Sequence, residues 1–162
     1  MKRLIFVLII ALFVCGACEE EESPAELWID IAPPIWAGNR SIDPEISPRD
    51  FNLQLTNRGD ELLVIDSVIK RGDRNCAFVF EGPDVSELMH NESAFIRVLY
   101  KPLVAEKDQV AMEISSNSHI NPLMVLPICG QGVVPGSEDP GEFDCTDPPA
   151  NQADCPDDLE GN

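Results

Sequence analysis

Basic residues are scarce in this chain of 162 residues. It has 11 Lys and Arg against 29 Asp and Glu, which gives a formal net charge of −18 at pH 7. Affinity for nucleic acid comes mainly from Lys and Arg side chains that neutralise phosphates. The charge balance therefore excludes nucleic acid as a partner, and we interpret the acidity as a solubility feature of an exported protein.

Helical periodicity is missing too. No segment of useful length repeats apolar residues at helical spacing, and only 6% of the residues are aromatic, whereas the chain has 14 prolines and 10 glycines. Turn-forming residues at this density fit a β protein better than a helical bundle. We therefore expect an all-β fold.

Groups suited to catalysis are few. The two histidines, His90 and His119, fall in predicted loops, and no serine or cysteine lies in a nucleophile-elbow context. Gly130-Gln131-Gly132 ends a predicted strand instead of opening a helix, so it does not match a phosphate-binding loop. The sequence predicts a protein that is not an enzyme and has no cofactor.

The longest apolar run is too short for a permanent membrane span. Fourteen residues, 4–17, follow the basic start Met1-Lys2-Arg3. As a helix they would extend roughly 21 Å, less than the ~30 Å of a bilayer's hydrocarbon core. This pattern is typical of a signal peptide, which we assign to residues 1–17.

The end of the leader carries a second signal. Gly16 and Ala17, both small, directly precede Cys18, which resembles a bacterial lipobox. Cleavage there would make Cys18 the lipidated first residue, and several acyl chains on one cysteine give stable attachment. The alternative is an ordinary signal peptide cut near Ala17, with Cys18 a spare thiol. The acidic residues 18–26 predict a solvated tether.

Alternation of apolar and polar residues predicts seven strands. They are expected at residues 27–32, 51–56, 62–70, 76–80, 92–100, 109–115 and 123–132. A period of two implies one buried and one solvated face, as in antiparallel sheets, and several such runs at short spacing indicate a β-sandwich. Residues 35–48 are expected to be irregular, with Trp36 in the core or at its edge, the alternative being a surface contact.

Five pieces of the sequence also occur in the order of a known family. They are Asn57-x-Gly59, Leu62-Leu63-Val64-Ile65, residues 95–102, residues 110–117 and Leu126-x-Ile128-x-Gly130-x-Gly132. Over residues 27–134 the chain resembles the immunoglobulin-like domain of the abnormal-spindle and hydin type, known in bacterial envelope proteins as the choice-of-anchor domain. The resemblance implies an immunoglobulin-like, seven-stranded antiparallel β-sandwich. Members usually carry a Phe-Gly pair after the first strand, where this chain has Pro34-Ile35-Trp36-Ala37-Gly38.

Beyond the sandwich, residues 135–162 form an acidic tail. Residues 136–162 contain nine acids, no Lys or Arg, and almost no large apolar residue. Such a segment buries too little to offset its ordering entropy, so we expect it to be disordered apart from any crosslink.

Four cysteines remain besides those of the leader region: Cys76, Cys129, Cys145 and Cys155. An exported chain meets an oxidising compartment, where four cysteines allow three pairings. Proximity in sequence favours Cys145–Cys155 together with Cys76–Cys129. The main rival links the tail to the domain through Cys129. A zinc site is the other alternative, but no Cys-x-x-Cys pair exists.

Two further patterns are similar to binding motifs. Arg71-Gly72-Asp73 matches an adhesion triplet, although such triplets are common by chance, and we interpret it as a hairpin turn. The tail's aspartates could offer oxygen ligands to calcium, but they lack the spacing of a calcium loop. These residues are Asp139, Asp144, Asp147, Asp154, Asp157 and Asp158. No metal site is predicted.

Together these features predict a lipid-anchored, non-catalytic binding or scaffolding protein of the bacterial cell envelope, in the outer membrane and facing the periplasm or the surface. Its expected partners are the membrane, through the anchor, and a protein or envelope polymer. One alternative is recognition of a polysaccharide, which exposed aromatics on one face would favour. Another is a periplasmic chaperone or assembly factor acting by β-strand addition, which needs an exposed sheet edge free of Pro and Lys.

Overall fold

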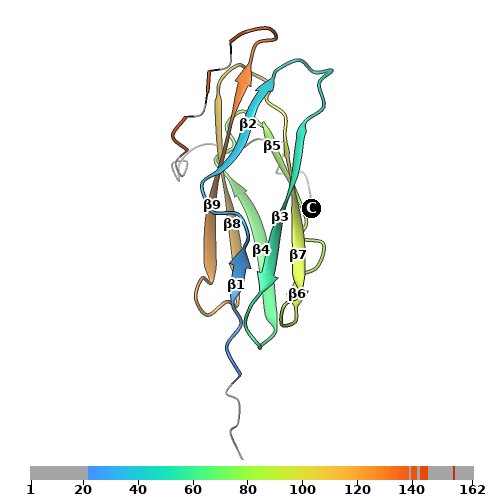
Figure 1. The fold of residues 1–162 in the computed structure, drawn as a ribbon, viewed down its shortest axis with the longest axis vertical. Coiled ribbons are helices and arrows are strands. Elements are labelled where there is room, and N and C mark those ends of the chain that lie inside the picture. Colours follow the sequence, from blue (N-terminus) through green and yellow to red (C-terminus); the bar gives the residue numbers. More distant parts are fainter. Residues whose placement is uncertain (1–21, 139, 142, 146–154, 156–162) are drawn as a thin grey trace, which may run out of the picture.

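The computed structural model describes residues 22–138, 140–141, 143–145 and 155, and these form an immunoglobulin-like β-sandwich (Figure 1). The leader assigned to residues 1–17, Cys18 and most of the tail lie outside the described residues. The strands are β1 (Leu27–Ile29), β2 (Ile35–Ser41), β3 (Arg49–Asn57), β4 (Leu63–Arg71), β5 (Phe78–Glu81), β6 (Glu87–Leu88), β7 (Ser93–Tyr100), β8 (Lys107–Ser116) and β9 (Leu123–Val133). No helix long and apolar enough for a membrane span occurs in this part of the chain.

Two sheets pack face to face. The first has the order β1-β3-β7-β5 and the second β2-β9-β8-β4-β6. Alternate residues of the long strands point between the sheets, which is why every second residue of β7 from Ala94 to Tyr100 is buried. The largest side chains that are fully buried there include Tyr100, Phe78, Leu53, Leu55, Ile96, Met112, Ile114, Leu126 and Ile128.

Each of the seven predicted strands has a counterpart, and two strands were not predicted. β6 is only two residues long. β2 lies in the segment that was expected to be irregular, and it pairs with β9 in parallel, so the second sheet is not wholly antiparallel. Its alternation is hidden because Gly38 adopts a φ of +89° at a register shift between Trp36 and Gly38.

The glycine pair near the end of β9 is needed for packing. A Cβ at Gly130 would lie 2.4 Å from ring atoms of Tyr100, and one at Gly132 would lie 1.9 Å from the carbonyl oxygen of Val104. Both distances are well inside van der Waals contact. The motif therefore lets the Tyr100 ring and the loop after β7 approach β9 closely.

Candidate functional site

An apolar groove opens where the chain crosses from one sheet to the other. β1 ends at Ile29 in the first sheet, and β2 begins at Ile35 in the second. β2 pairs only with residues 128–133 of β9, so the first half of β9 has a strand on one side only. The groove has a volume of about 350 Å³. It is lined by Leu27, Trp28, Ile29, Asp30, Ile31, Ala32, Pro33, Asn121 and Met124.

Trp28 forms part of the groove wall and remains 42% exposed. The guanidinium carbon of Arg58 lies 3.8 Å from the centroid of its ring, within the range of a cation–π contact. Arg58 therefore holds the indole in place while leaving part of it open to a partner. Two proline residues, Pro33 and Pro34, close the crossover and cannot donate backbone hydrogen bonds.

The predicted tether is shorter than the sequence indicated, because its last residues are packed on the sandwich. The Ser23 backbone N–H and hydroxyl donate to Asp60 Oδ2 over 2.9 and 2.8 Å. These two bonds, the backbone one first, hold the pKa of the Asp60 carboxyl below its usual range. Ala25 is only 2% exposed and belongs to the hydrophobic core. The remainder of the predicted tether, residues 18–21, lies outside the described residues.

Asn57 connects this incoming segment to the loop of residues 58–62 and to the end of β6. Its side-chain oxygen accepts from the backbone N–H of Glu26 (3.3 Å) and of Gly59 (3.0 Å). Its amide nitrogen donates to the carbonyls of Glu61 (2.8 Å) and Leu88 (2.9 Å). Asn57 is fully buried, and each of these four groups would lose a hydrogen bond without it. The Asn-x-Gly signal was visible in the sequence, but its four bonds were not.

A buried pair of hydrogen-bonded side chains, Asp108 and Tyr100, lies toward the other end of the sandwich. Asp108 Oδ2 accepts from the Tyr100 hydroxyl and Oδ1 from the Asn75 amide, both over 2.8 Å. Burial raises the pKa of Asp108 above its usual range, against the lowering effect of these two hydrogen bonds. Burial also raises the pKa of Tyr100, and the neighbouring Asp108 carboxylate adds to that shift. All acceptors here have donors, which fits a structural network better than an open site.

The raised pKa of Tyr100 predicts a loss of stability in alkali. Tyr100 is the chain's only tyrosine, so its phenolate absorbance can be followed directly. Above pH ~10 the unfolded chain releases this proton and the folded protein retains it, so stability falls by at most about 1.4 kcal/mol per pH unit. Urea unfolding between pH 8 and 11 should show that slope. Tyr100→Phe should lack it, and an equal slope in this variant would contradict the assignment.

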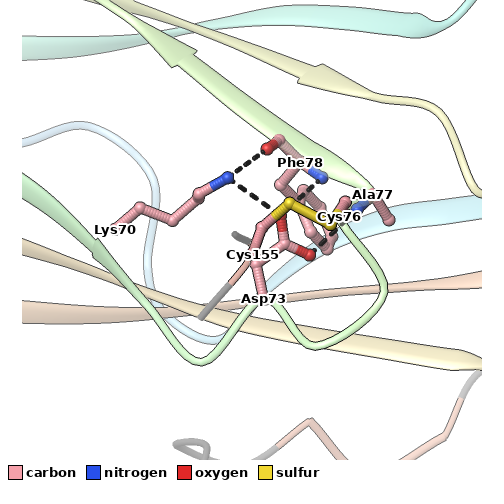
Figure 2. Close-up of a disulfide and its surroundings, with 6 residues drawn as sticks. All are labelled: Lys70, Asp73, Cys76, Ala77, Phe78 and Cys155. Carbon is pink, nitrogen blue, oxygen red and sulfur yellow. Dashed lines mark hydrogen bonds and ion pairs between the residues drawn. A yellow bond between two sulfur atoms is a disulfide. The ribbon is translucent and has the colours of Figure 1, made fainter. Parts of the chain in front are cut away.

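The Arg-Gly-Asp triplet is not a hairpin turn, and its aspartate is too buried to contact a partner. It leads from β4 in the second sheet to β5 in the first. Asp73 is 1% exposed and accepts from the backbone N–H of Ala77 (2.9 Å) and Phe78 (3.0 Å). Figure 2 shows the Lys70 ammonium between this carboxylate and the Phe78 carbonyl, at 3.0 and 2.8 Å. Asp73 thus fixes the loop between the sheets.

All four candidate cysteines form disulfides, but the favoured pairing is wrong. The bonds are Cys76–Cys155, drawn in Figure 2, and Cys129–Cys145. This is the rival that links the tail to the domain through Cys129. Leu126 and Ile128 point into the core, so Cys129 points to the outer face of its sheet, where the tail can reach it. Two disulfides are typical of an extracytoplasmic protein.

Aromatic packing brings the tail to that face. Trp36 lies between the core residues Ile35 and Ala37, so it also points outward, and it is half-buried outside the core instead of within it. The ring of Phe143 meets Trp36 edge-on at a centroid distance of 5.1 Å, and Lys107 Nζ lies 4.7 Å from the same Phe143 ring. The tail is therefore fixed at least here and at its two disulfides.

Signs of metal binding or catalysis are weak in the described residues. They contain no group of three His, Cys, Asp or Glu side chains able to hold a metal ion. His90 Nδ1 lies 3.0 Å from the Gly59 carbonyl oxygen and 3.3 Å from Asp60 Oδ1, where it supports a loop. Of the six aspartates of the tail, only Asp144 lies among the described residues.

Comparisons with known proteins support the fold alone. A scan against protein families gives no match, and neither does a comparison with curated proteins. A Porphyromonas gingivalis W83 protein of unknown function has a similar structure, with a TM-score of 0.56 and 19% identity. The match covers 68% of this chain and 48% of that one, so the chain spans about half of it.

Two more distant similarities were found. The secreted serine protease VesC from Vibrio cholerae has a TM-score of 0.46 at 14% identity, over 60% of this chain and 21% of that one. The ASH / PapD-like domain of human CEP192 has a TM-score of 0.47 at 12% identity, over 68% of this chain and 87% of that one. At these levels neither similarity informs function.

Proposed function

We propose that the protein is a lipid-anchored component of the bacterial cell envelope, attached through Cys18, whose sandwich is of the abnormal-spindle and hydin type. It binds or scaffolds a protein partner and performs no chemistry. The observation that carries this proposal is the apolar groove beside β1, because an open apolar surface next to an exposed Trp28 has no evident use in an isolated domain.

The lining of the groove favours a protein segment over a sugar. Its wall is mainly apolar, with Asp30 and Asn121 as the polar side chains among its lining residues. Polysaccharide sites rely on flat exposed aromatics, and here Trp28 lies under Arg58 while Trp36 lies against Phe143. An apolar side chain or short extended segment fits such a groove better.

Site-specific photocrosslinking in the native host tests this proposal. A photoreactive residue at Ile31, which lines the groove, should give a discrete protein adduct. The same residue at Val79, exposed on the opposite edge of the sheet, should give none. Ala32→Asp places a charge at an exposed position of the groove and should abolish the adduct, whereas Ala105→Asp, an exposed alanine elsewhere, should not. Equal adducts at both positions, or none, would contradict the proposal.

Strand addition is a second candidate, because β1 is an edge strand without Pro or Lys. In that mode the partner's backbone would pair with β1, and amide hydrogen exchange at residues 27–30 should slow when the partner binds. Binding through side chains alone would leave these amides unchanged. The short length of β1, three residues, limits any such pairing.

A further inference from the structure

We propose that the end of the sandwich formed by residues 57–62, 88–92 and 117–122 faces a lipid bilayer and rests against its surface. We call this the anchored end; it is the lower end in Figure 1. The inference rests on lipidation at Cys18, which belongs to the proposed function. It adds an orientation: one end of the domain is a membrane-facing surface. The groove, which Asn121 of that end helps to line, opens beside this surface, and the disulfide-linked tail is left for other contacts.

The first step is that the chain enters the fold rigidly at this end. Ser23 is bound to Asp60, the Arg58 N–H donates to the Glu26 carbonyl over 2.9 Å, and the His119 N–H donates to the Ala25 carbonyl over 2.9 Å. The Leu27 N–H donates to Ser118 Oγ over 3.0 Å. A Cβ at Gly59 would lie 1.9 Å from the Pro24 carbonyl oxygen, so the segment is also in close steric contact.

The second step is the length of chain that remains between the lipid and this contact. From Cys18 to Ser23 there are five residue steps (23 − 18). Whatever their conformation, a chain extends by at most ~3.6 Å per residue, so Ser23 lies within about 18 Å of the Cys18 backbone. β9 alone has 11 residues, or roughly 36 Å at ~3.3 Å each. If the opposite end faced the bilayer, Ser23 would lie roughly 36 Å from the lipid surface, which is beyond the reach of about 18 Å. The length of the chain therefore excludes that orientation.

The third step is the chemistry of the surface. The three loops expose Leu62, Met89 and Ile120, and Leu123 follows at the start of β9. Side chains of this kind enter the interfacial region of a bilayer readily. Asp60, Glu61 and Glu92 lie in the same loops, and acids are repelled by anionic lipids. The surface thus fits a zwitterionic bilayer. Apolar tips also occur at the opposite end (Ile46, Leu103, Val104 and Val134), so the chain length decides the orientation.

The two tryptophans supply the test, because they are the only ones in the chain and lie at different heights. Trp28 pairs with Thr56, one residue before the first of the three loops. Trp36 pairs with Cys129, six residues along β9 from Leu123 and so roughly 20 Å further away. Energy transfer to a dansyl group on the lipid headgroup falls with the sixth power of distance. Trp36→Phe, which retains Trp28, should therefore transfer much more strongly than Trp28→Phe.

The measurement uses lipidated full-length protein in phosphatidylcholine vesicles that contain dansyl-phosphatidylethanolamine. A matched variant with ten Gly and Ser residues inserted between Glu22 and Ser23 should lose most of the difference between the two donors. Equal or reversed transfer at native tether length would overturn the orientation. If a Trp variant does not fold, Leu62→Trp and Val104→Trp in the wild-type chain place added donors at the two ends for the same comparison.

Mass spectrometry of the same sample separates the two ways of failing. A chain without lipid would contradict the anchor and, with it, the orientation. A lipidated chain with equal transfer from both tryptophans would contradict the orientation alone and leave the proposed function intact.

Discussion

Asn57→Ala is expected to lower the free energy of unfolding by roughly 3–4 kcal/mol, because four hydrogen bonds, two of them buried and two partly buried, are lost at about 1 kcal/mol each. That is a large part of the 5–15 kcal/mol that stabilises a typical domain. Urea unfolding with the disulfides intact should show a lower midpoint at an unchanged slope. The loss should be this large because two N–H groups and two carbonyls each lose the hydrogen bond that the Asn57 side chain makes.

A matched control lies on the same strand. Asn52 is an asparagine of β3 that faces solvent, so Asn52→Ala should change stability by no more than about 0.5 kcal/mol. Asn57→Asp retains the two acceptor bonds and replaces the two donors with an oxygen that faces carbonyls, so it should be destabilising as well. A loss below about 1 kcal/mol for Asn57→Ala would show that the incoming segment, the loop of residues 58–62 and the end of β6 hold together without this residue.

The second large effect concerns the disulfides. Cys76 and Cys155 are 79 residues apart, and Cys129 and Cys145 are 16 apart. In the chain-entropy model these loops correspond to about 4–5 and about 3 kcal/mol. The pair Cys76→Ala and Cys155→Ala should therefore destabilise more than the pair Cys129→Ala and Cys145→Ala. Urea unfolding of the two double variants measures the order.

Peptide mapping without reduction tests the pairing itself. Trypsin cleaves between Cys76 and Cys129 after Arg97 and Lys107, and an aspartate-specific protease cleaves between Cys145 and Cys155 at Asp147 and Asp154. Linked peptides should contain Cys76 with Cys155 and Cys129 with Cys145. A peptide that joins Cys145 to Cys155 would contradict the structure and restore the pairing expected from the sequence.

The strands with a clear period of two could be predicted from the sequence. The parallel strand β2 and the pairing of the cysteines could not. β3, β7 and β8 could be found because each places alternate residues in the core. β2 could not, because the bulge at Gly38 and its polar second half hide the period. The pairing of the cysteines depended on the outward direction of Cys129 and on the Trp36–Phe143 contact, and neither is encoded locally.

The groove beside β1 could not be predicted for a similar reason. It forms only because β1 and β2 belong to different sheets, and strand alternation does not say which sheet a strand joins. The acidic run after Cys18 was interpreted as a uniform tether, whereas Ala25 belongs to the core. A single apolar residue beside Pro24 in an acidic segment carries too little pattern to reveal that.

Intact-mass spectrometry of protein extracted from the membranes of a bacterial host tests the central claim most directly. We predict a chain that begins at Cys18 and carries a diacylglyceryl group, with a gain of four hydrogens on reduction for the two disulfides. A chain cut near Ala17 without lipid would contradict the anchor and the orientation derived from it. Free thiols at the four cysteines would contradict the linked tail.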